Sequence, residues 1–134
     1  MTSNGTDRIF LDANVLFSAA HRAEAGLLIF WRLRGVTLCS SRYAIEEARA
    51  NLEEKSQKER LEELAAKLEI FEAGEEPLPA GIALPEKDRP ILAAAIAAGA
   101  THLVTGDVRH FGTYFGKRVA VVLVTTAAEY LRKR

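Results

Sequence analysis

The sequence contains only one cysteine, Cys39, so no disulfide bond can form within the chain. It also lacks a long apolar run: the longest, residues 91–98, is far shorter than the roughly 20 residues of a membrane-spanning helix. No basic stretch followed by apolar residues stands at its start, so no secretory signal peptide is expected. A chain with so little cysteine, no membrane span and no leader is expected in the reducing cytoplasm.

An excess of charge of either sign is also absent, because 18 lysines and arginines balance 18 aspartates and glutamates. The charges are unevenly placed, since residues 46–76 are mainly acidic and the chain from Arg109 onward is mainly basic. A basic edge beside an acidic cluster suits a phosphate backbone. An ordinary mixed surface explains the same pattern, and charge alone favours this simpler interpretation.

Several familiar motifs of nucleotide-binding and nucleophilic enzymes are missing. There is no GxGxxG fingerprint, no glycine-rich phosphate loop, no GxSxG elbow and no cysteine–histidine spacing of a zinc site. Catalysis by a serine or cysteine nucleophile is therefore not indicated. The chain offers instead a set of acidic residues at the expected ends of strands and helices.

The 134 residues suffice for one compact domain, and 49% of them are hydrophobic, which argues against disorder. Apolar periodicity and turn residues divide the chain into alternating strands and helices. Strands are expected at residues 9–11, 36–39, 102–105 and 119–124, with 68–71 as either a short strand or a helix end. Helices are expected at residues 15–33, 42–55, from 56, 88–98 and from 126. This alternation predicts a single Rossmann-like α/β domain over residues 1–134, a three-layer fold with a central parallel sheet of four to five strands.

Local signals mark where several helices begin or end. Ser40 and Ser41 provide hydroxyls to cap the helix expected after them. Residues 56–59 and 126–129 each have the form of a capping box, a serine or threonine followed three positions later by glutamate. Gly99 is suited to a C-terminal stop. Residues 1–7, which are polar, and 74–85, which are rich in glycine and proline, are expected to be irregular.

Acidic residues follow two of the expected strands. Asp12 comes directly after residues 9–11, and Asp107 comes after the strand at 102–105. If both strands belong to one parallel sheet, both carboxylates emerge at its carboxyl edge, where ligands bind in open α/β sheets. Asp88 stands before a helix. Each acid also has a purely structural explanation as a helix cap or turn residue, so the functional interpretation depends on their meeting at one edge.

The second expected helix offers two adjacent glutamates. On a helical wheel, Glu47 shares its side with Ala44 and Asn51, small residues that permit a close approach to the sheet. Glu46 lies on the side of Arg49, with which it can pair. Glu47 is therefore better placed to reach a cleft, although both glutamates could simply face solvent.

Three segments, FLDANVLFSA, SRYAIEEARANL and EKDRPILAAAIAAGATHLVTGDVRHFG, resemble the PIN-domain family of metal-dependent ribonucleases. This family includes the VapC-like toxins of toxin–antitoxin pairs. The similarity extends from residue 9 to the last strand, with the segments in the family's order and spacing. It implies a PIN-like fold, hydrolysis of RNA phosphodiester bonds, a homodimer, and a cognate antitoxin protein that covers the acidic cleft.

The resemblance also implies which residues form the site. The family's acidic set matches Asp12, Glu47, Asp88 and Asp107, which are expected to bind metal and to catalyse. Glu46 could be aligned in place of Glu47, and the leucine five residues beyond Glu47 favours the latter. Supporting polar positions of the family match Asn14, Ser18 and Thr105.

Two further residues near the last acid are candidates for contact with substrate phosphates. Arg109 lies two residues beyond Asp107, where plain salt bridging to the acids is about as good an explanation. His110 lies one position further, and a histidine in a loop often has no special role.

Clustered carboxylates repel one another in apolar surroundings and shift towards protonation unless a cation joins them. A set of oxygen ligands suits Mg²⁺ or Mn²⁺ rather than zinc, and such ions activate water without a protein nucleophile. Two other functions stay open. One is a non-catalytic PIN-like module that binds RNA or protein. The other, less favoured, is a phosphatase or phosphoacceptor domain with Asp12 as nucleophile, for which the second aspartate and a suitably placed lysine are missing.

Overall fold

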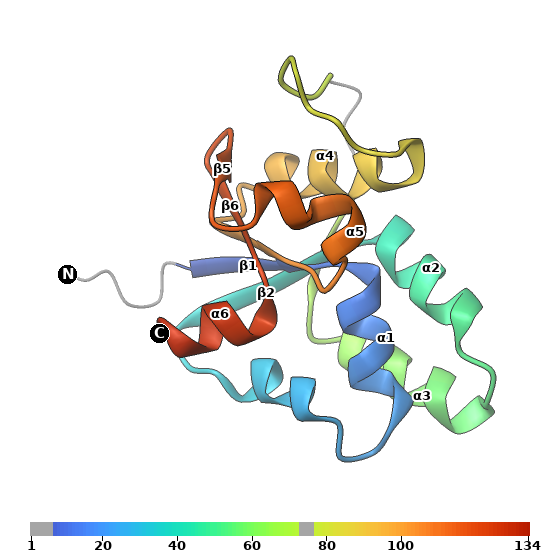
Figure 1. The fold of residues 1–134 in the computed structure, drawn as a ribbon. Coiled ribbons are helices and arrows are strands. Elements are labelled where there is room, and N and C mark those ends of the chain that lie inside the picture. Colours follow the sequence, from blue (N-terminus) through green and yellow to red (C-terminus); the bar gives the residue numbers. More distant parts are fainter. Residues whose placement is uncertain (1–6, 73–76) are drawn as a thin grey trace.

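The computed structural model describes residues 7–72 and 77–134, and within these ranges six strands form one sheet in the order β3-β2-β1-β4-β6-β5 (Figure 1). The strands are β1 (Asp7–Leu11), β2 (Val36–Ser41), β3 (Glu69–Phe71), β4 (His102–Val104), β5 (Arg118–Val119) and β6 (Val122–Thr125). Every neighbouring pair is parallel except β5 and β6. The predicted α/β fold around a parallel sheet is confirmed. The irregular segments predicted at 1–7 and 74–85 lie partly outside the described residues.

Helices cover both faces of this sheet. The α-helices are α1 (Ala13–His21), α2 (Arg42–Asn51), α3 (Lys55–Ala65), α4 (Arg89–Ala97), α5 (Val108–Phe111) and α6 (Ala127–Arg132). The 3₁₀ helices are η1 (Gly26–Arg32), η2 (Glu86–Asp88) and η3 (Gly112–Tyr114). Figure 1 shows α4 on one side of the sheet and α6 on the other. Among the described residues, none of the helices is long and apolar enough to cross a membrane.

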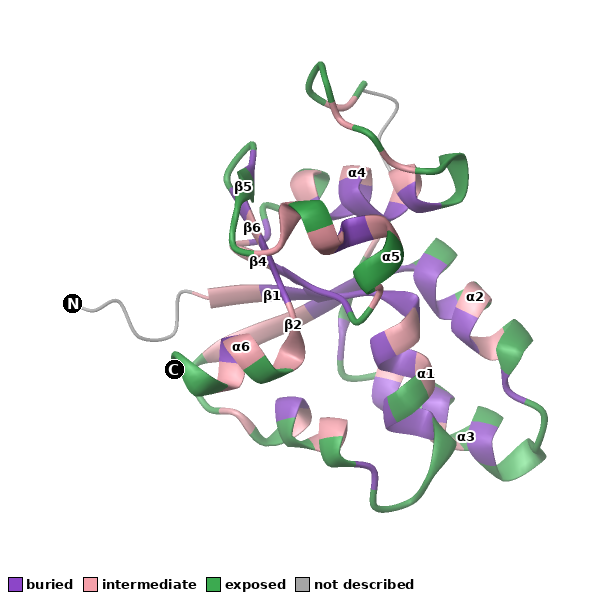
Figure 2. Ribbon diagram, viewed as in Figure 1, coloured by how far each residue is buried: buried purple, intermediate pink, exposed green. Residues whose placement is uncertain are grey.

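The core is built around β1, which lies between β2 and β4. Ile9, Phe10 and Leu11 are fully buried, as are Phe30 of η1 and Phe111 of α5. A strand that is covered on both faces is a continuous apolar run instead of an alternating one. Figure 2 accordingly shows the later parts of β1 and β2 as buried, their first residues as intermediate, and the outward sides of the helices as largely exposed.

The apolar spacing over residues 15–33 predicts one continuous helical segment. This prediction is wrong, because the helix is shorter than expected. α1 ends at His21, and the later apolar residues belong to η1. The indole nitrogen of Trp31 donates a hydrogen bond to the carbonyl of Leu64 at 3.1 Å, which holds η1 against the end of α3. This contact joins residues 33 positions apart, so local periodicity cannot reveal it.

α2 begins as predicted, because Ser41 accepts a backbone hydrogen bond in the first turn at 3.1 Å. The neighbouring Ser40 does not cap the helix; its hydroxyl donates to the carbonyl of Leu11 at 2.7 Å and joins β2 to β1. α2 is shorter than the predicted 42–55, because Leu52 adopts extended backbone and is buried in the core.

The capping box of α3 lies earlier than predicted. Glu54, not Ser56, is the cap, and Gln57 closes the box by accepting hydrogen bonds from the backbone. Gln57 is fixed in this position because its amide nitrogen donates to the carbonyl of His21 at 3.2 Å. The cap predicted for the last helix is confirmed, since Thr126 accepts a backbone hydrogen bond in the first turn of α6.

The strand predicted at 119–124 is in fact a hairpin. β5 and β6 pair antiparallel, and the chain reverses at Ala120, which has a φ of 55°. A left-handed residue at such a turn is usually glycine or asparagine, so the sequence carries no ordinary turn signal here. The hairpin brings the sheet to six strands, more than the four to five expected.

The pairing of β1 with β4 fixes the position of the site. The two strands are adjacent and parallel, with Leu11 opposite Val104. The backbone N–H of Asp12 donates to the carbonyl of Val104 at 3.1 Å, so Asp12 and Thr105 leave the sheet side by side. The turn after β4 then brings Asp107 to the same carboxyl edge.

Candidate metal centre

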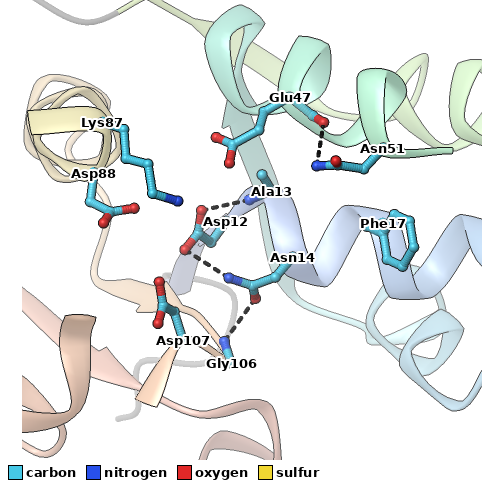
Figure 3. Close-up of a pocket in the computed structure, with 10 residues that line it drawn as sticks. All are labelled: Asp12, Ala13, Asn14, Phe17, Glu47, Asn51, Lys87, Asp88, Gly106 and Asp107. Atoms are coloured by element: carbon cyan, nitrogen blue, oxygen red, sulfur yellow. Dashed lines mark hydrogen bonds between the residues drawn. The ribbon is translucent and has the colours of Figure 1, made fainter. Parts of the chain in front are cut away.

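A cleft of about 480 Å³ lies at this edge of the sheet (Figure 3). It is lined by Asp12, which directly follows β1, by residues of α1, α2 and η2, and by the turn after β4. These residues are Asp12, Ala13, Asn14, Phe17, Glu47, Asn51, Lys87, Asp88, Gly106 and Asp107. The structure thus brings together the four acids that the sequence selects, although they are far apart along the chain.

Asp12 is the most firmly held of the four. It is 4% exposed, and its Oδ1 accepts a hydrogen bond from the backbone N–H of Ala13 at 2.6 Å. Its Oδ2 accepts one from the Thr105 hydroxyl at 2.7 Å and one from the side-chain amide of Asn14 at 3.1 Å. The structural interpretation of Asp12 as the N-cap of α1 is therefore correct, and the same carboxylate also faces the cleft (Figure 3).

Burial raises the pKa of Asp12 from its ordinary value of 3.8 to about 6. The hydrogen bonds from Thr105 and Ala13 lower this pKa and offset part of the effect of burial. The negative charges of Asp88 and Glu47 raise it further. A carboxyl group that is both buried and close to other acids binds its proton unusually tightly.

Asn14 and Thr105, the supporting residues, link the end of β1 to the turn after β4. The side-chain oxygen of Asn14 accepts from the backbone N–H of Gly106 at 2.8 Å. Thr105 is fully buried, and its hydroxyl oxygen accepts from the backbone N–H of Asp107 at 3.1 Å. A Cβ at Gly106 would lie 3.4 Å from the Asn14 side-chain oxygen, at the limit of ordinary van der Waals contact, so little room is left beside this bridge.

Asp88 and Asp107 differ in how well their carboxylates are satisfied. Asp107 caps α5, and its Oδ1 accepts from the backbone N–H of His110 at 3.1 Å. Asp88 stands at the N-terminus of α4 but makes no capping hydrogen bond with its side chain. Its side chain is 7% exposed, and its Oδ2 is buried without a hydrogen-bond partner. The capping explanation therefore fails for Asp88.

His110 lies between these two carboxylates. Its Nδ1 is 2.8 Å from Oδ2 of Asp88 and 2.9 Å from Oδ2 of Asp107. Potential ligand atoms of the three residues lie within 4.8 Å of one another, close enough to hold one metal ion. His110 Nδ1, like Asp88 Oδ2, is buried without a hydrogen-bond partner.

The two glutamates of α2 take separate directions. Glu47 is half-buried, and its carboxylate points into the cleft (Figure 3). Glu46 is exposed outside the cleft, where it forms the predicted ion pair with Arg49. Arg49 also pairs with Glu62 of α3 at 2.8 Å. The geometry therefore places Glu47, and not Glu46, beside the other three acids.

The family model of the PIN domain matches residues 8–109, which is most of the chain. The chain belongs to the PIN-domain family. The matched region of this PIN domain contains all four cleft acids and ends just before His110. No curated protein sequence matches the chain.

Two solved structures share the fold of this PIN domain. VapBC2 from Rickettsia felis, bound to a DNA fragment from their promoter, is 18% identical with a TM-score of 0.62, over 89% of this chain and 98% of that chain. FitAB bound to an IR36 DNA fragment is 20% identical with a TM-score of 0.54, over 88% of this chain and 94% of that chain. At these identities the similarity shows the fold alone.

Some selected residues lie outside the cleft of the PIN domain, and some cleft residues were not selected. Ser18 and Arg109 are exposed and do not line it. Thr105 and His110 do not line it either, but each lies against acids that do. Sequence reasoning missed Lys87 as a lining residue; its ammonium group points towards Asp12 and Asp88 (Figure 3). The sequence signal for Lys87 is only its place beside Asp88. Phe17, which shares a face of α1 with Asn14, and Asn51, which shares a face of α2 with Glu47, were recoverable from helical spacing.

The set of donors fits a divalent cation. Carboxylate oxygens dominate the cleft, and one of them, Asp88 Oδ2, is buried without a hydrogen bond. A buried unsatisfied carboxylate oxygen is costly, and a cation relieves this cost and the mutual repulsion of the acids.

Proposed function

We propose that this PIN domain is an Mg²⁺- or Mn²⁺-dependent endoribonuclease that hydrolyses RNA phosphodiester bonds. Its catalytic and metal-binding carboxylates are Asp12, Glu47, Asp88 and Asp107. The observation that carries the proposal is that these four acids, from four separate parts of the chain, line one cleft. Two of them are almost fully buried, which is unusual for aspartate unless the group is paired or binds a cation.

Different residues have different roles in the proposed reaction. Hydrogen bonds from Ala13, Thr105 and Asn14 hold Asp12 in one orientation, as expected for a preorganised ligand. Glu47 reaches in from α2, where it is placed to orient the attacking water. When bound, the divalent ion polarises the phosphodiester and lowers the pKa of that water. Lys87, whose ammonium group points towards Asp12 and Asp88, offers a positive charge to a substrate phosphate in the cleft.

The biological part of the proposal is that this chain is the toxin half of a toxin–antitoxin pair. It forms a homodimer, and a cognate antitoxin protein inhibits it by covering the cleft. VapBC2 and FitAB, two of the structural neighbours, support this part by analogy of fold. A small neighbouring reading frame whose product binds the chain and suppresses RNA cleavage would support it. RNA cleavage that stays at its full rate in the presence of each neighbouring gene product would contradict it.

The Asp-nucleophile alternative has less support. The position two residues beyond Asp12 is Asn14, whose side chain is engaged with Asp12 and Gly106. That residue therefore cannot supply the second acid of a phosphoacceptor site. The non-catalytic alternative leaves the shared cleft of four acids without a role.

The direct test is cleavage of a radiolabelled RNA by the purified chain with Mn²⁺, with Mg²⁺, and with a chelator. Cleavage that requires a divalent ion supports the proposal. Undetectable cleavage of tRNA, rRNA and mRNA substrates in the presence of both ions, by protein that is folded, would contradict it.

A matched pair of variants tests the assignment on α2. Glu47→Gln is expected to reduce cleavage by about 10–100-fold, a typical effect of losing a residue that supports a metal site. Glu46→Gln removes the same charge one residue away, at an exposed ion pair, and is expected to leave cleavage within about twofold of the wild type. Equal losses in both variants would show that general charge, and not the cleft position, matters.

A further inference from the structure

The side chain of His110 lies beside two of the cleft acids, and its position there is unexplained. Its Nδ1 lies 2.8 Å from Asp88 Oδ2 and 2.9 Å from Asp107 Oδ2, but neither contact has the geometry of a hydrogen bond. Both Nδ1 and Asp88 Oδ2 are buried atoms without a hydrogen-bond partner. Leaving two such atoms unsatisfied side by side is costly, which indicates that a further group belongs between them.

The separations of these atoms suit ligands of one ion. Mg²⁺, which holds six ligands at about 2.0–2.1 Å, places neighbouring ligand atoms about 2.9 Å apart, so the separations suit an ion of about this size. Local structure keeps the imidazole at this point. His110 lies in the first turn of α5, and its backbone N–H donates to Oδ1 of Asp107 at 3.1 Å, which leaves Oδ2 of the same carboxylate beside the ring.

We infer that His110 Nδ1 is a direct ligand of the ion, together with Asp88 and Asp107, and that the cleft therefore prefers Mn²⁺ over Mg²⁺. Mg²⁺ is a hard cation that takes oxygen ligands. Imidazole nitrogen instead suits first-row transition metals, so one nitrogen among the carboxylates shifts the preference towards them. The inference rests on the proposed function, because it concerns the ion of the same cleft, and it replaces the phosphate contact that the sequence suggests for His110.

The test compares the dissociation constants of Mn²⁺ and Mg²⁺, measured by calorimetry on the wild type and two variants. His110→Gln is expected to weaken Mn²⁺ binding by about 10–100-fold and Mg²⁺ binding much less. Loss of a residue that only supports a ligand already has an effect of this size on metal affinity. The matched control is His21→Gln, at the exposed end of α1 and outside the cleft. It is expected to leave both constants unchanged.

Pulsed electron paramagnetic resonance gives a second readout that needs no variant and no activity. Bound Mn²⁺ should show the echo modulation of a coordinated ¹⁴N nucleus, and labelling the wild type with ¹⁵N-histidine should change that modulation. This measurement decides the question even if His110→Gln fails to fold.

The outcomes separate the inference from the proposed function. Nitrogen modulation that shifts on ¹⁵N labelling, with a Mn²⁺ preference that falls in His110→Gln, supports the inference. A different result would overturn the inference and leave the metal-dependent nuclease intact. In that result the wild type binds Mn²⁺ and Asp88→Asn does not, but bound Mn²⁺ shows no nitrogen modulation and His110→Gln keeps the wild-type preference between the two ions. A wild type that binds neither ion overturns both.

Discussion

Asp12→Asn is expected to lower the rate of RNA cleavage by about 1,000-fold. The substitution keeps the shape of the side chain but removes its negative charge from the centre of the cleft. Metal-ion catalysis contributes several kcal/mol of transition-state stabilisation, and a loss of about 4 kcal/mol corresponds to this factor. The measurement is single-turnover cleavage of a labelled RNA at saturating Mn²⁺, which separates chemistry from product release.

Asp7→Asn is the matched control for this variant. Asp7 lies at the opposite end of the same strand, where its carboxylate accepts a hydrogen bond from the Tyr130 hydroxyl at 2.6 Å. An asparagine oxygen can still accept that bond, so cleavage should stay near the wild-type rate. If Asp12→Asn, purified free of other nucleases, cleaves as fast as Asp7→Asn, Asp12 is not part of the catalytic machinery.

The convergence of Asp12 and Asp107 could be predicted because it follows from the parallel sheet alone. Once residues 9–11 and 102–105 are read as buried strands, their carboxyl ends must face one edge if the strands pair in parallel. The pairing of Leu11 with Val104 realises this geometry. Glu47 could be chosen over Glu46 by helical spacing, since the period of a helix places neighbouring residues on different sides.

The contact of His110 with Asp88 could not be predicted in the same way. The two residues belong to α5 and η2, and their approach depends on how these short elements pack, which no local pattern encodes. The spacing of three residues between Asp107 and His110 could be read from the sequence, but this segment was expected to be a loop, and α5 was not predicted. The spacing also did not indicate that the imidazole would face a second acid.

The helix predicted at 15–33 and the strand predicted at 119–124 were wrong for the same reason, because contacts between distant residues decide the backbone there. Apolar spacing continues from α1 into η1, so periodicity alone cannot show the turn between them. The reversal at Ala120 occurs without glycine or asparagine at the turn. In both cases long-range packing determines the backbone conformation, and the local sequence pattern either gives no indication of it or indicates a different one.

A second large effect is expected in the stability of the metal-free protein. The pKa of Asp12 is raised from 3.8 to about 6 by burial, so the folded state binds the proton more tightly than the unfolded state does. The contribution of Asp12 to stability is therefore fully present below pH 4 and is lost as the pH rises through 6. At neutral pH this residue alone destabilises the fold by about 3 kcal/mol, in the absence of metal.

Asp12→Asn should therefore make the metal-free protein more stable at pH 7.5, even though it removes activity. The expected gain is about 1–2 kcal/mol, because the amide avoids the cost of a buried charge but loses the hydrogen bond from Asn14. At pH 4 the gain should vanish. The measurement is urea unfolding in a chelator across this pH range, taken as the difference between variant and wild type so that other carboxylates cancel.

Adding Mn²⁺ at pH 7.5 should reverse the order of the two proteins. An ion at 100 times its dissociation constant stabilises the wild type by about 2.7 kcal/mol, and a variant with weakened binding gains far less. The Asp12 carboxylate, which destabilises the metal-free protein, would then stabilise the protein by binding the ion. Parallel pH curves for the two proteins would show that the Asp12 charge does not destabilise the metal-free fold. An equal gain from Mn²⁺ would show that Asp12 is not a metal ligand.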